Sequence, residues 1–264
     1  MSVGTVPTGS PARDCKGFHP AGPDPAMDEG DTVDRLRAVG VAAYVAGAGL
    51  VASLLVASVA ISALGAETTA QEQVASAVGL GLGAATVVFF YLRWTGRPVA
   101  FLDVRRPDRR DVLVAVAGGV ALAVVSLGLE ALYGALGVGT ATHGTVEALD
   151  GAGEGTLYVA VATSLLLVGP GEELLYRNVV QKSLYARFSR ASAVAVASAL
   201  FALAHAPAYA GGAATAAALA ATLGVVLALS LVLGSAYALT DNVLVPAVLH
   251  GCYNAATFVE VILG

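Results

Sequence analysis

Long hydrophobic stretches follow one another along most of the chain, separated by short polar segments. An apolar stretch of about 20 residues is long enough for a helix to cross the hydrocarbon core of a membrane. The pattern predicts seven helices, at about residues 38–65, 74–93, 112–134, 156–187, 190–206, 213–238 and 243–263. It indicates no internal repeat and no second domain. We therefore expect an all-α, polytopic transmembrane helical bundle of about seven to eight spans.

The two parts of the chain differ in composition. Residues 1–34 are rich in Gly, Pro and Asp and contain no apolar core, so we expect a disordered cytoplasmic tail rather than a secretory signal. Met27 stands directly before the first predicted helix, which raises the alternative that residues 1–26 precede the true start. The bundle then comprises residues 35–264, and its polar motifs lie within 156–263.

Composition excludes an ordinary soluble domain. Hydrophobic residues make up 57% of the chain and charged residues only 12%, with a mean hydropathy of +0.76, whereas soluble domains average about 25% charged residues. The net charge of −5 is spread along the loops and indicates no nucleic-acid partner. We expect an integral protein of the plasma membrane, surrounded by lipids.

The basic residues predict the orientation of the bundle. All fourteen Lys and Arg residues lie in three segments, 1–37, 93–111 and 177–190, that face the same side if the helices alternate in direction. The loops on the other side carry acidic residues and no basic ones. Because cytoplasmic loops are enriched in Lys and Arg, we expect the N-terminus in the cytoplasm.

The fourth hydrophobic stretch contains a Gly169-Pro170-Gly171 sequence. Proline removes a helix donor and glycine weakens a helix, so this sequence predicts a broken helix near residues 169–171. Irregular backbone at membrane depth is tolerated where protein or a water-filled cavity covers it. The expected second half-helix would begin with two acids in its first turn, where the helix dipole favours negative charge.

Those acids are Glu172 and Glu173, followed by Arg177. On a helix, Glu173 and Arg177 are four residues apart in the favourable order, so we expect an ion pair. Glu172 points about 100° away from Glu173 and lacks this partner, which leaves it free to take a proton as a general base. The alternatives are a structural ion-pair cluster and a proton site in a transporter.

Two further patterns place polar groups in apolar helices. Phe201 stands one turn before His205, where it could pack beside the imidazole. His250 and Asn254 share one face of the last predicted helix and could together bind a developing oxyanion, and Gly251 between them would allow close helix approach. Alternatively, each group makes only a hydrogen bond between helices. The remaining histidines, His19 and His143, lie in polar segments and are interpreted as incidental.

Taken together, the motifs EExxxR, FxxxH and HxxxN on successive predicted helices resemble those of the CPBP intramembrane protease family. That family includes the CAAX prenyl endopeptidases and bacterial members linked to bacteriocin processing or immunity. The resemblance covers residues 156–263, and Asn178 departs from it, because members commonly place Gly after the Arg. It implies that Glu172 activates a water that His205 helps to orient or deprotonate.

The resemblance also implies that His250 and Asn254 stabilise the oxyanion, while Glu173 and Arg177, with Phe201 beside them, support the scaffold. A metal is an open alternative: Glu172, His205 and His250 would be a legitimate zinc set, although the sequence contains no His-Glu-x-x-His motif. The expected cofactor is therefore either none or a divalent metal such as zinc, and we favour activation of the water without a metal.

Our leading hypothesis is an intramembrane endopeptidase that hydrolyses a membrane-associated or lipid-anchored peptide or protein, with a hydrated pocket that opens to the cytoplasm. One alternative is a non-catalytic membrane protein of the binding or immunity type. The other is a proton-coupled transporter, although such folds commonly carry internal repeats.

Overall fold

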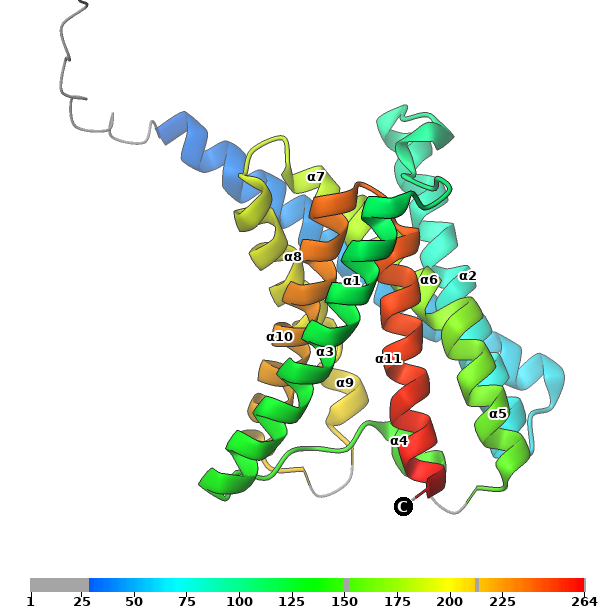
Figure 1. Cartoon of the computed structure of the whole chain (residues 1–264). Coiled ribbons are helices and arrows are strands. Elements are labelled where there is room, and N and C mark those ends of the chain that lie inside the picture. The colour runs from blue at the N-terminus through cyan, green and yellow to red at the C-terminus, as the bar shows by residue number, and fades with distance from the viewer. Residues whose placement is uncertain (1–28, 150–151, 212–213, 264) are drawn as a thin grey trace, which may run out of the picture.

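The structure is a computed structural model that describes residues 29–149, 152–211 and 214–263. Within these ranges the chain forms helices and no strands (Figure 1). Most of the residues predicted as a tail lie outside the described ranges. Helix α1, however, begins at Glu29, so the predicted boundary at residue 34 is late: an ion pair between Asp31 and Arg35 at 2.8 Å lies within its first turns.

The helical elements follow the hydrophobic pattern. In chain order they are α1 (Glu29–Leu64), α2 (Thr69–Thr95), the 3₁₀ turn η1 (Val99–Phe101), α3 (Arg109–Leu136), α4 (Gly144–Leu149), α5 (Glu154–Thr163), the π-helical η2 (Ser164–Val168), α6 (Gly169–Glu173), the π-helical η3 (Leu174–Gln181), α7 (Lys182–Leu184), α8 (Arg190–Ala204), α9 (Ala206–Tyr209), α10 (Ala216–Thr240) and α11 (Leu244–Leu263). Each of the seven predicted helices is present.

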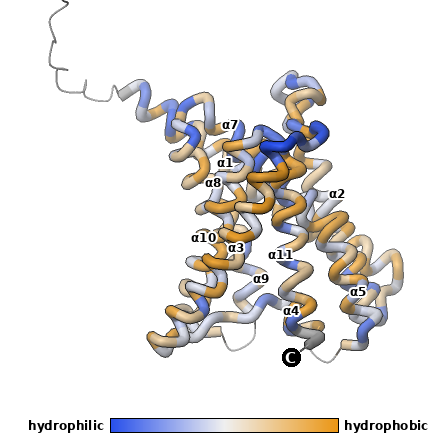
Figure 2. Tube along the Cα trace, viewed as in Figure 1, coloured by the Kyte–Doolittle hydropathy of each residue, from blue (hydrophilic) through white to orange (hydrophobic). Residues whose placement is uncertain are grey.

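Five helical segments of the described chain are long and apolar enough to cross a membrane: Gly30–Leu64, Thr69–Thr95, Arg109–Leu136, Glu154–Leu184 and Ala216–Thr240. Helix α8 is apolar but shorter. Figure 2 shows hydrophobic residues along the middle of the helices and hydrophilic residues gathered toward their ends. Large apolar side chains on the outside of the bundle, such as Val116, Val120 and Val124 of α3, are more than 60% exposed. The molecule is therefore an integral membrane protein whose outer surface suits lipid.

Helices α1 and α2 form the tightest pair. A Cβ atom on Gly79 or Gly83 of α2 would collide with the backbone of Ala57 or Ser53 in α1. Small residues at such a contact let two membrane helices approach closely. Beside this pair, the core includes Val179 and Val180 of η3 and Ala197 and Phe201 of α8. A second cluster joins α3, α10 and α11.

The fourth hydrophobic stretch corrects one prediction. Residues Glu154–Leu184 do not separate into two half-helices; they run as one irregular helix, in which π-helical turns flank α6. Pro170 lacks a backbone N–H donor. The wider π turns beside it accommodate this missing hydrogen bond, so the helix continues. Because the helix continues through Gly169, no free helix N-terminus faces the glutamates, and the expected dipole contribution is absent.

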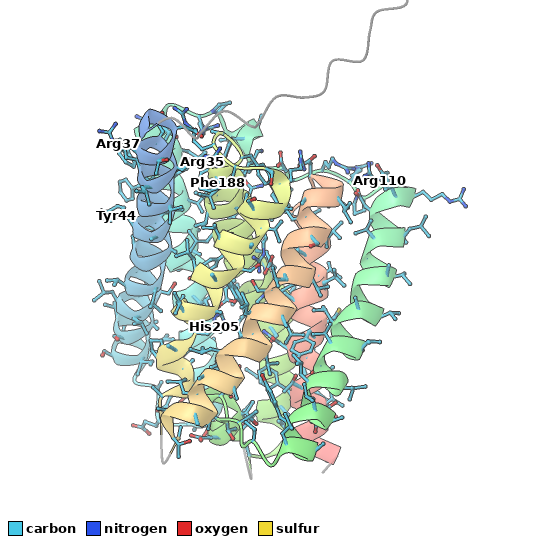
Figure 3. All side chains as sticks on the ribbon, turned by 90° about the vertical axis from the view of Figure 1, so that its left-hand side faces the viewer. Arg35, Arg37, Tyr44, Arg110, Phe188 and His205 are labelled. Atoms are coloured by element: carbon cyan, nitrogen blue, oxygen red, sulfur yellow. The ribbon has the colours of Figure 1, made fainter. Side chains whose placement is uncertain are left out.

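A polar network closes the end of the bundle that holds the basic residues. Asp103 accepts hydrogen bonds from Lys182 Nζ at 2.7 Å and from the Tyr237 hydroxyl at 2.6 Å. Arg105 pairs with the buried Asp111 at 2.7 Å. Figure 3 shows Arg35, Arg37 and Arg110 at this end, with His205 far below them. The short helices α4 and α9 lie toward the opposite end (Figure 1).

Candidate active site

The proposed site lies where α6, α8 and α11 meet. Glu172 of α6, His205 at the end of α8, and His250 and Asn254 of α11 all line one cavity of about 240 Å³. His205 follows the end of α8 at Ala204, and its side chain is partly buried, with 17% of its surface exposed. The structure thus brings together all four residues that the sequence suggested for chemistry.

Glu172 is the centre of this group. Its Oε2 atom lies 3.6 Å from Nε2 of His250 and 3.8 Å from Nε2 of His205. These distances exceed an ordinary hydrogen bond, and Oε2 is buried with no hydrogen-bond partner among the described residues. Buried polar groups in proteins are nearly always satisfied by protein or by water. The gap between the three atoms is therefore suited to a bound water molecule.

The hydrogen bonds of the two imidazoles fix which nitrogens face Glu172. Nδ1 of His205 lies 2.9 Å from the carbonyl oxygen of Phe201. Because a carbonyl can only accept, this Nδ1 must carry the proton, and the Nε2 of neutral His205 presents a lone pair to the site. His205 can thus accept a hydrogen from a water bound at Glu172.

Glu173 and Arg177 form the predicted ion pair, and both side chains are fully buried. Arg177 Nε donates to Glu173 Oε2 at 2.9 Å, and Arg177 Nη2 donates to the Ser230 hydroxyl at 2.9 Å. The other oxygen of Glu173 lies 3.0 Å from Nδ1 of His250. The ion pair therefore orients His250 with its Nε2 toward Glu172, as carboxylates commonly orient functional histidines.

Phe201 packs against this polar group from α8. Its ring centroid lies 4.3 Å from that of His205 and 5.8 Å from that of His250. The Arg177 guanidinium stands 5.0 Å from the centre of the same ring, a cation–π contact. The predicted contact between Phe201 and the His205 imidazole is confirmed, and the ring also separates both histidines from the core.

Close helix approach at the site depends on two glycines. A Cβ atom on Gly169 would lie 2.7 Å from the carbonyl oxygen of Ala247, and one on Gly251 would lie 3.0 Å from Ser164 O. The first separation is shorter than real Cβ contacts and the second is tighter than most of them, so glycine at both positions permits the close approach of α11 to the irregular fourth helix. The prediction that Gly251 allows close approach is confirmed, and this contact brings His250 and Asn254 to the cavity.

Glu172, His205 and His250 are the side chains that could hold a metal. Glu172, His205 and His250 have suitable chemistry for zinc, but within the described residues no three His, Cys, Asp or Glu side chains gather in an arrangement that could hold a metal ion. The metal alternative stays a prediction, and no catalytic step is derived through a metal.

The cavity extends toward the end of the bundle opposite the basic residues. From Glu172 it continues past Gln73 and Ser76 in the first turns of α2 to Thr145 of α4 and Thr257 of α11. Between Glu172 and the basic end, the space is filled by the fully buried Arg177, Asn178, Gln181 and Leu184. The expectation that the pocket opens on the side of the basic residues is therefore wrong: the packed side chains of η3 and α7 close that side.

The cavity also contains residues that the sequence motifs did not predict. His143, interpreted as incidental, lines it together with Tyr209 and Tyr253. No signal in the sequence placed His143 there, because it belongs to a connection between helices without periodicity. Tyr253 could have been suspected, since it directly precedes Asn254 in the last motif.

The comparison with protein families gives a match over the same part of the chain. Residues 154–256 match the family model described as Type II CAAX prenyl endopeptidase Rce1-like. The motif-bearing segment is therefore similar to this family. This match confirms the resemblance to the CPBP family. Because the matched family is a protease family, the match also supports the prediction of an endopeptidase in general. Neither the curated proteins nor the solved structures give a match.

The matched segment includes the residue that departs from the family pattern. Asn178 is fully buried, and its Nδ2 atom donates to the Tyr237 hydroxyl of α10 at 3.3 Å. It does not line the cavity around Glu172. The departure therefore alters the packing between η3 and α10 and leaves the polar group untouched.

Proposed function

We propose that this protein is an intramembrane endopeptidase in which a water activated by Glu172 hydrolyses a peptide bond of a membrane-associated substrate. The observation that supports this most is the unpartnered Glu172 Oε2, faced at 3.6 and 3.8 Å by two imidazole nitrogens inside a cavity. The match to a protease family over residues 154–256 supports the same conclusion.

The first step is attack by water. Glu172 Oε2 and His205 Nε2 accept the two hydrogens of a water molecule, which directs its lone pair toward the carbonyl carbon of the substrate. As the carbon–oxygen bond forms, one proton passes to Glu172 and negative charge develops on the carbonyl oxygen. General-base assistance of this kind contributes typically about 10²–10⁴ in rate.

The second step needs donors for the oxyanion and a proton for the leaving amine. In its protonated form His250 donates from Nε2, and the carboxylates of Glu172 and Glu173 on either side stabilise that positive charge. The amide of Asn254, which lines the same cavity, supplies the second donor. When the carbon–nitrogen bond breaks, Glu172 returns its proton to the amine.

Peptide cleavage tests this proposal directly. Purified protein in lipid nanodiscs is offered a panel of lipid-tethered peptides, and products are identified by mass spectrometry. We expect cleavage by the wild type, and a loss in kcat of about 10²–10³ for Asn254→Ala with little change in KM, the usual cost of one oxyanion donor. Cys252→Ser is the matched control, because Cys252 is on the same helix but exposed.

Two outcomes would contradict the proposal. If Asn254→Ala cleaves as fast as Cys252→Ser, the oxyanion assignment is wrong. If the wild type cleaves nothing and instead carries a solute together with protons into liposomes, the polar group is the proton site of a transporter.

The side from which substrate enters follows from two observations. The predicted orientation places the described parts of the basic segments on the cytoplasmic side, and the cavity extends toward the other side. With the N-terminus in the cytoplasm, the pocket receives substrate from the outer side of the plasma membrane. Prenylated peptide ends, which the family description names, are one class of lipid-anchored substrate to include in the panel.

Cysteine labelling in whole cells tests this entry side. In a background without Cys15 and Cys252, we expect a cysteine at Ser76, which lines the cavity, to react with a membrane-impermeant maleimide added outside. The control is Arg110→Cys, an exposed position at the basic end, which should react only after the membrane is permeabilised (Figure 3). The opposite pattern of labelling would reverse the orientation.

A further inference from the structure

His143 is a histidine of this site that the motifs do not include. Besides the cavity of about 240 Å³, a second cavity of about 190 Å³ reaches the site between α1, α2 and α8. Among the described residues, four line both cavities: Leu80, His143, Glu172 and His205. A peptide that occupies both cavities must therefore pass His143 at the point where it passes Glu172.

The hydrogen bond of His143 determines which nitrogen it presents. The backbone N–H of Thr145 donates to Nδ1 of His143 at 3.0 Å. Nδ1 is therefore an acceptor, and the proton of the neutral ring is on Nε2. This Nε2–H makes no hydrogen bond with the described residues. It is a donor held at the junction of the two cavities.

Charge does not change this assignment. Burial first, and the nearby His205 second, lower the pKa of His143 to about 4. The ring is therefore neutral near pH 7. Its role is therefore that of a fixed neutral donor, and not that of an acid or base.

The segment that carries His143 is anchored on both sides. The imidazole packs edge-on against Tyr209 of α9, with ring centroids 4.9 Å apart. Before it, the hydroxyl of Thr222 bonds to both the N–H and the carbonyl of Ala141, at 2.8 and 3.3 Å. After it, Leu149 is buried in a small cluster with Leu157 and Phe258. The donor is thus positioned before any substrate arrives, which reduces the cost of binding.

We propose that His143 is a substrate-positioning residue, whose Nε2–H donates to a main-chain carbonyl oxygen of the peptide next to the scissile bond. The inference rests on the proposed endopeptidase function. A carbonyl is the fitting acceptor, because no Lys or Arg of the described ranges lines either cavity while Glu172 lines both. A substrate carboxylate at this place would meet a negative charge and no positive one.

Two isosteric substitutions separate this role from a structural one. The amide nitrogen of a glutamine reaches the place of Nε2, so His143→Gln keeps the distal donor. The shorter His143→Asn keeps a group that can accept from the Thr145 N–H, as asparagine does at helix N-termini, but it loses the distal donor. If His143 positions the substrate, Gln should preserve cleavage. If His143 only caps α4, Asn should preserve it.

The variants are assayed in nanodiscs with a lipid-tethered peptide that the wild type cleaves. We expect His143→Asn and His143→Ala to lose on the order of tenfold in kcat/KM, mostly through KM, as the loss of one neutral hydrogen bond predicts. His143→Gln should stay within about threefold of the wild type on the same grounds. The shape of the pH–rate profile should be the same in all four proteins. Rescue by Asn and not by Gln, or no loss in any variant, would overturn the proposal.

A binding measurement distinguishes this inference from the proposed function. In a Glu172→Gln background, equilibrium binding of the same fluorescent tethered peptides is compared with and without His143→Asn. Weaker binding on His143→Asn supports the inference even if no wild-type cleavage is found, in which case the endopeptidase proposal fails alone. Cleavage by the wild type together with unchanged binding overturns the inference alone. If the wild type neither binds nor cleaves any peptide, both are overturned.

Discussion

Replacing Glu172 by glutamine should reduce peptide cleavage by about 10³-fold or more, close to the full contribution of a general base. The amide keeps the size of the carboxylate but cannot accept the proton of the attacking water. The measurement is single-turnover cleavage of a lipid-tethered peptide in nanodiscs, followed by mass spectrometry.

The control for this variant is a shorter acid at the same position. Glu172→Asp keeps the acid on a shorter side chain and should retain more activity than Glu172→Gln, although the carboxylate moves away from His205 and His250. Both variants should keep the thermal stability of the wild type, since Glu172 Oε2 makes no hydrogen bond with the described residues. Undiminished cleavage by Glu172→Gln would remove Glu172 from the mechanism.

Replacing Arg177 by methionine should destabilise the fold by about 3–5 kcal/mol, the cost of leaving one member of a buried ion pair without its partner. Arg177 is fully buried, and its loss would leave the carboxylate of Glu173 with only His250 as a charged partner. The measurement is the free energy of unfolding in detergent, or the apparent melting temperature where unfolding is irreversible.

A double variant isolates the cause. Glu173→Gln together with Arg177→Met removes both charges and should recover much of the lost stability, because an uncharged pair does not leave a buried charge unpaired. The double variant should remain a poor enzyme, since Glu173 also orients Nδ1 of His250. Equal stability of wild type and Arg177→Met would show that the ion pair contributes nothing to the fold.

Local spacing predicted part of the site well. The ion pair of Glu173 and Arg177, and the contact of Phe201 with His205, follow from residues four apart on one helix, which are neighbours whatever the rest of the fold does. The seven hydrophobic stretches likewise predicted seven helices, because only a helix satisfies its backbone within a membrane.

Features that depend on packing between helices could not be derived from spacing. The meeting of Glu172 with His205 and His250 requires three helices to approach, and before the structure it rested on a family resemblance. The sequence Gly169-Pro170-Gly171 predicted a break, but a π turn on either side absorbs the irregularity and the helix continues. Gly169 matters instead because α11 packs against it.

The direction of the cavity and the role of His143 illustrate the same limit. Gln181 and Leu184 are among the side chains that close the basic end. In the sequence, their positions indicate only the end of a helix. His143 reads as a polar residue in a connection, and it reaches the site only because α4 folds back against α2, α9 and α11. Neither fact leaves a periodic pattern in the sequence.

Hydrolysis at this cavity is the central claim, and isotope incorporation tests it most directly. Purified protein in nanodiscs is incubated with the lipid-tethered peptides in water enriched in ¹⁸O, and products of the wild type and of Glu172→Gln are compared by mass spectrometry. The account predicts new peptides with one ¹⁸O atom in the newly formed carboxyl group, from the wild type only. Equal amounts of such products from both proteins, or none from either, would contradict it.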